Sequence, residues 1–145
     1  FRYDIIWEKT LPVGFLNAKK MPLRAHENIS IFYKKLPTYN PQKTDGHQRK
    51  SSKRVSKTEI YGKADKETSY NSTERFPRSV IKFSHDKQKK ALHTTQKPVA
   101  LLRWLIKTYS NENDVVLDFF GGVFSTGVAA LLEQRKFIGI EKDTN

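Results

Sequence analysis

The sequence predicts an α/β fold built around a mostly parallel sheet. Near the C-terminus, the runs DVVLD (114–118) and KFIGIE (136–141) have the apolar character of buried strands, and STGVAALLEQ (125–134) between them is typical of a small-residue helix. Strand, helix and strand in this order make a βαβ unit, whose two strands are parallel. A second helix is expected before this unit, because apolar residues recur at helical spacing from Val99 to Tyr109 behind Pro98.

Two strand-like runs open the chain. YDIIWE (3–8) and ISIFYKK (29–35) are rich in isoleucine and aromatic residues, a composition that favours strands. The stretch LPVGFLNAKKMPLRAHEN (11–28) lies between them and holds two prolines and a glycine, so it is expected to be a long connection. Long connections inside compact domains are often functional.

The middle of the chain, residues 37–92, is polar, basic and poor in aliphatic residues. Such a composition is typical of a solvated linker or a disordered insertion. Aromatic residues interleave with the charges, however, which suits a surface that becomes ordered on nucleic acid; they are Tyr39, Tyr61, Tyr70 and Phe76. The run SVIKF (79–83) is expected to end this stretch as a strand.

The charge balance favours a polyanionic partner. Lysine and arginine number 27 against 15 acidic residues, for a net charge of +12, and most of the excess lies between Lys34 and Lys90. Neutralised phosphates release counterions, so a nucleic acid is the expected partner; a basic protein without such a partner is the alternative. The absence of cysteine excludes disulfides, thiolate metal sites and cysteine nucleophiles. No apolar run approaches the roughly 20 residues of a membrane span, which favours a cytoplasmic protein without a membrane partner.

The turn between the first strand and the helix of the βαβ unit is a candidate ligand site. Its glycines bring main-chain N–H groups and a helix N-terminus to the carboxyl end of the sheet. Asp118 and Glu141, at the ends of the two strands, are expected at the same crevice. A carboxylate repels the pyrophosphate of a nicotinamide dinucleotide and attracts the ammonium and sulfonium groups of S-adenosylmethionine. The alternative is that Asp118 caps its strand and Glu141 is an ordinary surface acid.

Three pieces of the sequence, in one order, resemble the amino-methylating DNA methyltransferases of the permuted β class. The C-terminal piece runs from HTTQKP (93–98) through DFFGG (118–122) to IGIE (138–141). Near the N-terminus, Arg24, His26 and Glu27 match the family's Arg-x-His-Glu element, and ERFPRSVIKF (74–83) is similar to the strand that precedes the cofactor half.

The resemblance implies a Rossmann-like, S-adenosylmethionine-dependent methyltransferase fold, present here in part, with a mostly parallel sheet, helices on both faces and a basic insertion. Residues 1–36 would follow the catalytic motif, 37–92 would recognise DNA, and 93–145 would bind the cofactor. The implied reaction methylates adenine N6 or cytosine N4 in double-stranded DNA, on a base swung out of the duplex. The residues that would line the cofactor pocket are His93, Lys97, Pro98, Asp118, Phe119, Gly122 and Glu141.

The family's catalytic tetrapeptide, an Asp, Ser or Asn followed by Pro-Pro and an aromatic residue, does not occur in these 145 residues. No catalytic residue is therefore assigned. Two interpretations stay open: a piece of a longer methyltransferase, or a DNA-binding remnant that cannot catalyse alone. A restriction-system partner and a homodimer are both compatible with the sequence.

Phe124 departs from the family pattern, because relatives usually carry glycine at this position of the turn. A bulky residue at positive φ is unfavourable by about 1–2 kcal/mol. We therefore expect Phe124 to weaken the binding of S-adenosylmethionine, through backbone strain or by filling the pocket.

Overall fold

The computed structural model describes residues 1–55, 67–85 and 96–142. These residues divide into two compact units: one made of Phe1–Gln42 and Arg78–Asn145, the other of Lys43–Pro77. The smaller unit is an insertion in the larger one.

The larger unit begins with a three-stranded sheet in the order β2-β1-β5. Strands β1 (Tyr3–Val13) and β2 (Arg24–Ile31) form an antiparallel hairpin, and β5 (Val80–Phe83) pairs parallel with β1. Alternate residues of β1 face the core, so Ile5 and Trp7 are buried, and the Trp7 indole N–H donates to the carbonyl oxygen of Phe83 at 3.0 Å. The strand expected at 79–83 is thus confirmed.

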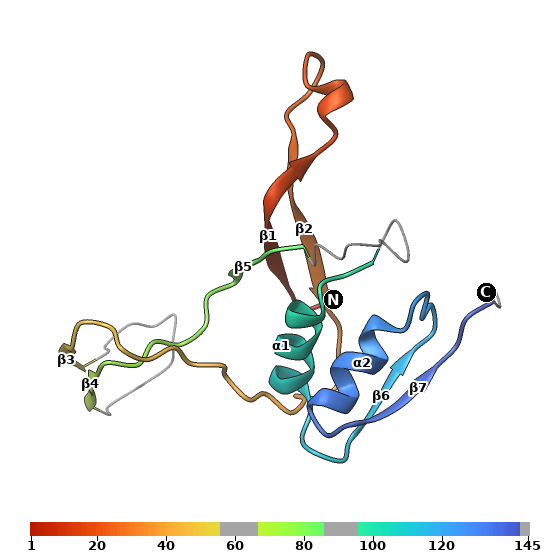
Figure 1. The fold of residues 1–145 in the computed structure, drawn as a ribbon. Helices are drawn as coiled ribbons and strands as arrows, with labels where there is room; N and C mark the ends of the chain where they lie inside the picture. Colours follow the sequence, from red (N-terminus) through yellow and green to blue (C-terminus); the bar gives the residue numbers. More distant parts are fainter. Residues whose placement is uncertain (56–66, 86–95, 143–145) are drawn as a thin grey trace. The chain divides into compact units, whose positions relative to one another are not determined.

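The expected long connection between the first two strands is much shorter than its sequence indicates. The pairing of β1 with β2 continues past Glu8, opposite His26, to Val13, opposite Arg24. Main-chain hydrogen bonds across the hairpin are not encoded in local composition, so prolines and a glycine indicate a loop even where the strands are paired. Figure 1 shows this hairpin reaching away from the rest of the larger unit.

Helix α1 (Val99–Tyr109) joins two apolar clusters of the larger unit. Leu101 packs against Ile5, Trp7 and Ile81 of the first sheet. Ile106 packs on the other side against Ala129 and Ala130 of α2 (Ser125–Leu132). The expected start at Pro98 is confirmed, since Pro98 is the buried residue that precedes the first helical turn.

Residues 37–42 belong to the larger unit because Asn40 caps the C-terminal end of α1. Its main-chain N–H donates to the carbonyl oxygen of Thr108 at 2.7 Å, and its side-chain amide donates to the carbonyl oxygen of Ser110 at 3.0 Å. The last carbonyls of a helix have no partner within the helix, so these bonds fix the chain just before the smaller unit begins.

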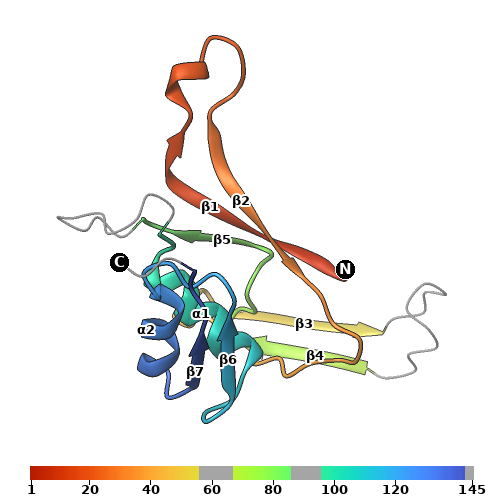
Figure 2. The ribbon, with the colours of Figure 1, turned by 90° about the vertical axis from the view of Figure 1, so that its right-hand side faces the viewer.

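The βαβ unit is present as the sequence predicts. Strand β6 (Val115–Asp118), α2 and β7 (Lys136–Gly139) follow one another, and the two strands are parallel, with Val115 opposite Lys136. Figure 2 shows α2 along one face of β6 and β7, where Val116 and Phe137 pack on its alanines. The residues on the opposite face are exposed: Val115, Leu117, Ile138 and Ile140.

In its sheets, the larger unit differs from the single, mostly parallel sheet that we expected. The described residues contain the mixed sheet β2-β1-β5 and the separate parallel pair β6-β7, with two α-helices. The βαβ unit by itself indicates parallel strands. Strands β1 and β2, however, are consecutive and joined by a turn, and such strands run antiparallel.

The smaller unit is a hairpin of β3 (Lys50–Val55) and β4 (Glu67–Ser72). Its base is held by the paired main chains of Thr44 and Arg75 and by the Lys43–Glu74 ion pair at 2.8 Å. The compact unit spans Lys43–Pro77, a shorter range than the 37–92 segment expected to recognise DNA.

In 1–55, 67–85 and 96–142, no helix is long and apolar enough to cross a membrane. The same ranges contain no group of His, Asp and Glu residues placed to hold a metal ion.

Candidate cofactor site

A hollow of about 430 Å³ lies at the carboxyl end of β6, between the turn that follows this strand and the start of α1. Its volume falls within the roughly 300–1,000 Å³ of small-molecule sites. Residues from four places in the chain line it: Gln96, Lys97, Leu102, Asp118, Phe120, Gly121, Gly122, Val123, Ser125, Thr126 and Glu141.

The two acids expected at the strand ends share this hollow. Asp118 is the last residue of β6, and its Oδ1 accepts a hydrogen bond from the main-chain N–H of Phe120 at 3.0 Å. Glu141 follows β7, and its Oε2 accepts one from the N–H of Gly122 at 2.5 Å. The N–H of Ile140 donates to the carbonyl oxygen of Asp118 at 2.8 Å, which ties the two strand ends together. The acids therefore form one negative rim on an ordered turn.

The turn adopts the left-handed backbone that glycine permits, at two positions. Gly122 has φ 51°, and Phe124 has φ 56° although it carries a side chain. The Phe124 ring lies against Phe137, with ring centroids 6.1 Å apart in an edge-to-face arrangement. A Cβ atom on either Gly121 or Gly139 would collide with the Phe124 ring, so both glycines make room for it.

Phe124 is not among the residues that line the hollow. The part of our expectation in which its ring fills the pocket is therefore not what the structure shows. The left-handed backbone at Phe124 is part of the folded turn itself.

Lys97 lines the hollow and also joins two distant parts of the larger unit. Its ammonium donates to Oε2 of Glu27 on β2 at 2.8 Å, across 70 positions of sequence. Glu27 also pairs with Lys9 at 2.5 Å, and both ammonium groups lie over the Trp7 ring, at 5.4 and 5.9 Å from its centroid. These contacts hold the segment that precedes α1 against the sheet.

The pKa of the Glu27 carboxyl is lowered from its ordinary value of 4.5. Partial burial acts to raise it, but hydrogen bonds and charge attraction from Lys9 and Lys97 outweigh burial. Glu27 therefore stays ionised in its pairs with Lys9 and Lys97. The sequence identifies it only as part of the Arg-x-His-Glu element. Arg24 and His26 are exposed on the same strand.

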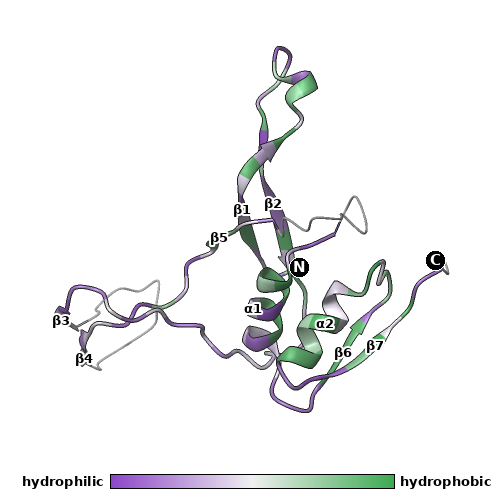
Figure 3. Ribbon diagram, in the orientation of Figure 1, coloured by the Kyte–Doolittle hydropathy of each residue, from purple (hydrophilic) through white to green (hydrophobic). Residues whose placement is uncertain are grey.

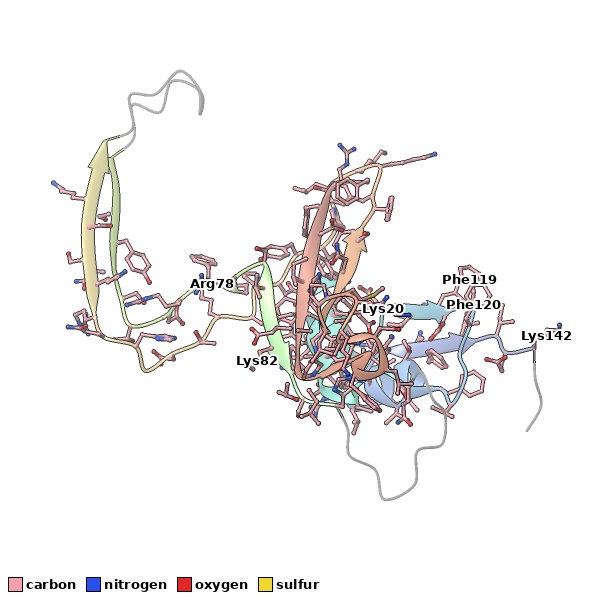
Figure 4. The ribbon with its side chains drawn as sticks, turned by 90° about the horizontal axis from the view of Figure 1, so that it is seen from above. Lys20, Arg78, Lys82, Phe119, Phe120 and Lys142 are labelled. Atoms are coloured by element: carbon pink, nitrogen blue, oxygen red, sulfur yellow. The ribbon has the colours of Figure 1, made fainter. Side chains whose placement is uncertain are left out.

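The remaining expected residues have different positions. Pro98 is buried at the start of α1 and does not line the hollow. Phe119 is exposed and lies outside the lining, whereas the next residue, Phe120, lines it; Figure 4 shows both rings just after β6. His93 lies outside the described residues.

Sequence reasoning missed several lining residues. Gln96 lies beside Lys97 in the HTTQKP stretch (93–98), so the same motif could have identified it as a pocket residue. Ser125 and Thr126 form the first turn of α2, where main-chain N–H groups without helical partners favour polar or anionic groups. Leu102 is part of the helical apolar stripe, and nothing in its spacing distinguishes a lining residue from a core residue.

The arrangement can bind a small molecule that carries both positive charge and hydroxyl groups. Two carboxylates attract a cation, and carboxylate oxygens accept hydrogen bonds from hydroxyls. Gly122 has no Cβ, and a Cβ built there would meet no other atom within 4 Å, so the main chain is open to close approach.

The model of a family described as DNA methylase, N6_N4_Mtase, matches residues 1–145. The Type II methyltransferase M.HinfI of Haemophilus influenzae is 34% identical over 143 residues, which cover 97% of this chain and 35% of that protein. The DNA adenine methyltransferase YhdJ of Escherichia coli is 57% identical over 49 residues, or 34% of this chain and 17% of its own length. The chain thus spans about a third or less of the curated relatives it matches.

Solved structures share the fold. A crystal structure of an M1.HpyAVI–SAM complex superposes with a TM-score of 0.61 at 24% identity, over 99% of this chain and 56% of that one. The cytosine-N4-specific PvuII DNA methyltransferase gives a TM-score of 0.63 at 16% identity, over 97% and 46%. With the family match along its whole length and the identity to M.HinfI, the chain belongs to the N6/N4 DNA methylase family.

Proposed function

We propose that this chain is the cofactor-binding and DNA-contacting part of a methyltransferase that transfers a methyl group from S-adenosylmethionine to adenine N6 or cytosine N4 of DNA. The observation that carries the proposal is that Asp118 and Glu141 line the same hollow in a member of this family. Relatives named as adenine and as cytosine-N4 methyltransferases both match, so the proposal keeps both target bases.

The residues present fit S-adenosylmethionine. Asp118 would attract its ammonium and sulfonium groups, and Glu141 would accept hydrogen bonds from its ribose hydroxyls. Gly122 and the first turn of α2 would lie against the polar end of the molecule. When bound, S-adenosylmethionine supplies the methyl group, and the role of these residues is to hold and orient it.

The basic surface would hold the DNA. Most of the net charge of +12 comes from residues 34–90, and the hairpin unit Lys43–Pro77 lies within that range. Lysine and arginine contacts to phosphates fix a protein on the duplex without reading its sequence. A restriction-system partner and a second copy of the chain are further candidate partners, and sedimentation velocity would detect the second copy.

Methyl transfer itself would need the Pro-Pro-aromatic tetrapeptide, which these 145 residues do not contain. We therefore assign binding rather than catalysis to this chain alone, and propose that activity requires a polypeptide that supplies the tetrapeptide. The alternative, favoured by the same observation, is a DNA-binding remnant that retains the fold without catalysis.

Titration calorimetry of the full chain with S-adenosylmethionine and, separately, with NAD⁺ tests the proposal. We expect heat of binding with S-adenosylmethionine and none with NAD⁺, whose pyrophosphate the acids repel. Binding of NAD⁺, or of neither ligand, would overturn the assignment of the cofactor. Salt-sensitive binding to duplex DNA without any binding of S-adenosylmethionine would instead support the remnant.

A further inference from the structure

The tip of the β1–β2 hairpin, residues 11–24, is an ordered turn rather than a loose loop. A short 3-10 helix, η1 (Phe15–Asn17), follows Gly14, whose φ is 89°. Main-chain hydrogen bonds close the turn: Asn17 donates to Gly14 at 3.0 Å, and Lys20 and Met21 both donate to Asn17, at 2.8 and 3.0 Å. These bonds give the tip a defined backbone.

This ordered turn presents apolar side chains to solvent. Phe15 is 75% exposed and Leu16 is 85% exposed, and Figure 3 shows the apolar colour of the short helix at the end of the hairpin. Other residues of the tip are also apolar and exposed: Leu11, Val13, Met21 and Leu23. Several exposed apolar side chains on one short segment point to an interaction site.

The charge around these apolar residues is entirely positive. Lys19, Lys20 and Arg24 are exposed on the tip, and the sequence has no acidic residue between Glu8 and Glu27. Within the described part of the chain, none of these three cations is in an ion pair with an acid. Lys20 is labelled in Figure 4.

An apolar tip could bind either another protein or DNA, and the positive charge of this tip favours DNA. Lysine is depleted at the centre of protein–protein interfaces. Proteins that bind the minor groove of DNA, by contrast, combine arginine and lysine with apolar side chains that wedge between base steps. Lysine and arginine also contact the phosphates of the duplex.

We propose that the hairpin tip is a DNA-binding wedge: Phe15 and Leu16 insert between base steps from the minor groove, and Lys19, Lys20 and Arg24 contact the flanking phosphates. This inference rests on the proposed DNA partner and adds a surface of the larger unit that binds it. Partial unstacking at the wedge bends the duplex, which distinguishes insertion from simple phosphate contact.

The test uses the full chain and a short duplex labelled at its two ends with a fluorescent donor and acceptor. Anisotropy gives the affinity at several salt concentrations, and energy transfer gives the bend. The variant Phe15→Ser with Leu16→Ser removes the wedge, and Lys19→Gln with Lys20→Gln removes two charges. Leu131→Ser, at an exposed leucine of α2, is the matched control.

We expect the wedge variant to abolish the bend and to weaken binding at least fivefold, with the salt dependence unchanged. The lysine variant should lower the slope of log affinity against log salt by roughly 2, at about 0.9 per phosphate contact. The control should behave like the unmodified chain. Unchanged affinity and bend in the wedge variant would overturn the proposal for the tip. So would a dimer that sedimentation velocity detects in the unmodified chain but not in the wedge variant, because a second copy would then be the occupant. If the unmodified chain binds no DNA, the proposed DNA partner fails as well, whereas cofactor binding is unaffected.

Discussion

The main-chain N–H of Gly122 donates to Oε2 of Glu141 at 2.5 Å, and so joins the turn after β6 to the end of β7. The bond fixes the carboxylate that the proposal assigns to the ribose, on the same rim as Asp118. Together with the contact of Asp118 with the N–H of Phe120, it fixes both carboxylates of the candidate site.

The Phe124 ring should make Gly121 intolerant of a side chain. In Gly121→Ala the new methyl group would overlap this ring, and overpacking of this kind destabilises by about 1–3 kcal/mol. The variant Phe124→Gly should remove the conflict, so that Gly121→Ala has a much smaller effect in that background. Urea unfolding of both single variants and the double variant measures the coupling; additive effects would place the ring elsewhere.

Phe124→Gly by itself should leave the affinity for S-adenosylmethionine within about threefold of the unmodified chain, or about 0.7 kcal/mol. The ring does not line the hollow. Its removal should instead affect folding, where relief of about 1–2 kcal/mol of strain opposes the loss of the contact with Phe137. Calorimetry on both forms measures the affinity; a tenfold gain would restore the view that Phe124 obstructs the cofactor.

Protonation of Glu27 should account for part of the loss of folding stability in acid. Its pKa is lower in the folded chain than the ordinary 4.5, so the unfolded chain takes up this proton first as the pH falls. The contribution of Glu27 to stability is then present above the ordinary pKa of 4.5 and is lost as the pH drops through the lower folded pKa. Glu27→Gln should be less stable than the parent at neutral pH, with the difference shrinking in acid.

Urea unfolding of the parent and of Glu27→Gln between neutral pH and pH 3 measures this effect. Glu112→Gln, at an exposed acid, is the control and should follow the parent. A difference between parent and Glu27→Gln that stays constant across the range would show that the ion pairs with Lys9 and Lys97 do not contribute.

The C-terminal part of the fold could be predicted because its signals are local. The strands around Val116 and Phe137 and the helix between them are each encoded by a continuous pattern, and the structure has all three. Asp118 and Glu141 could be placed together for the same reason, since parallel strands joined by a helix end at the same edge.

The parts that could not be predicted depend on contacts between distant residues. The length of the β1–β2 hairpin follows from pairs such as Val13 with Arg24, and the link from Lys97 to Glu27 spans 70 positions. Phe119 and Phe120 lie where strand alternation ends, so the sequence gives no rule for which ring faces the hollow. The structure assigns that place to Phe120.

The charge of Asp118 is the most direct test of the account. Asp118→Asn keeps an oxygen that can accept the hydrogen bond from the N–H of Phe120 and removes only the negative charge. Glu141→Gln does the same at the other acid, and Glu112→Gln is again the control. Circular dichroism would establish that each variant is folded.

Titration of these chains with S-adenosylmethionine by calorimetry is the decisive measurement. We predict that the unmodified chain binds, that Asp118→Asn and Glu141→Gln each lose at least tenfold in affinity, about 1.4 kcal/mol, and that Glu112→Gln binds like the parent. Equal affinity in all four chains would contradict the account, because the two acids would then play no part in holding the cofactor.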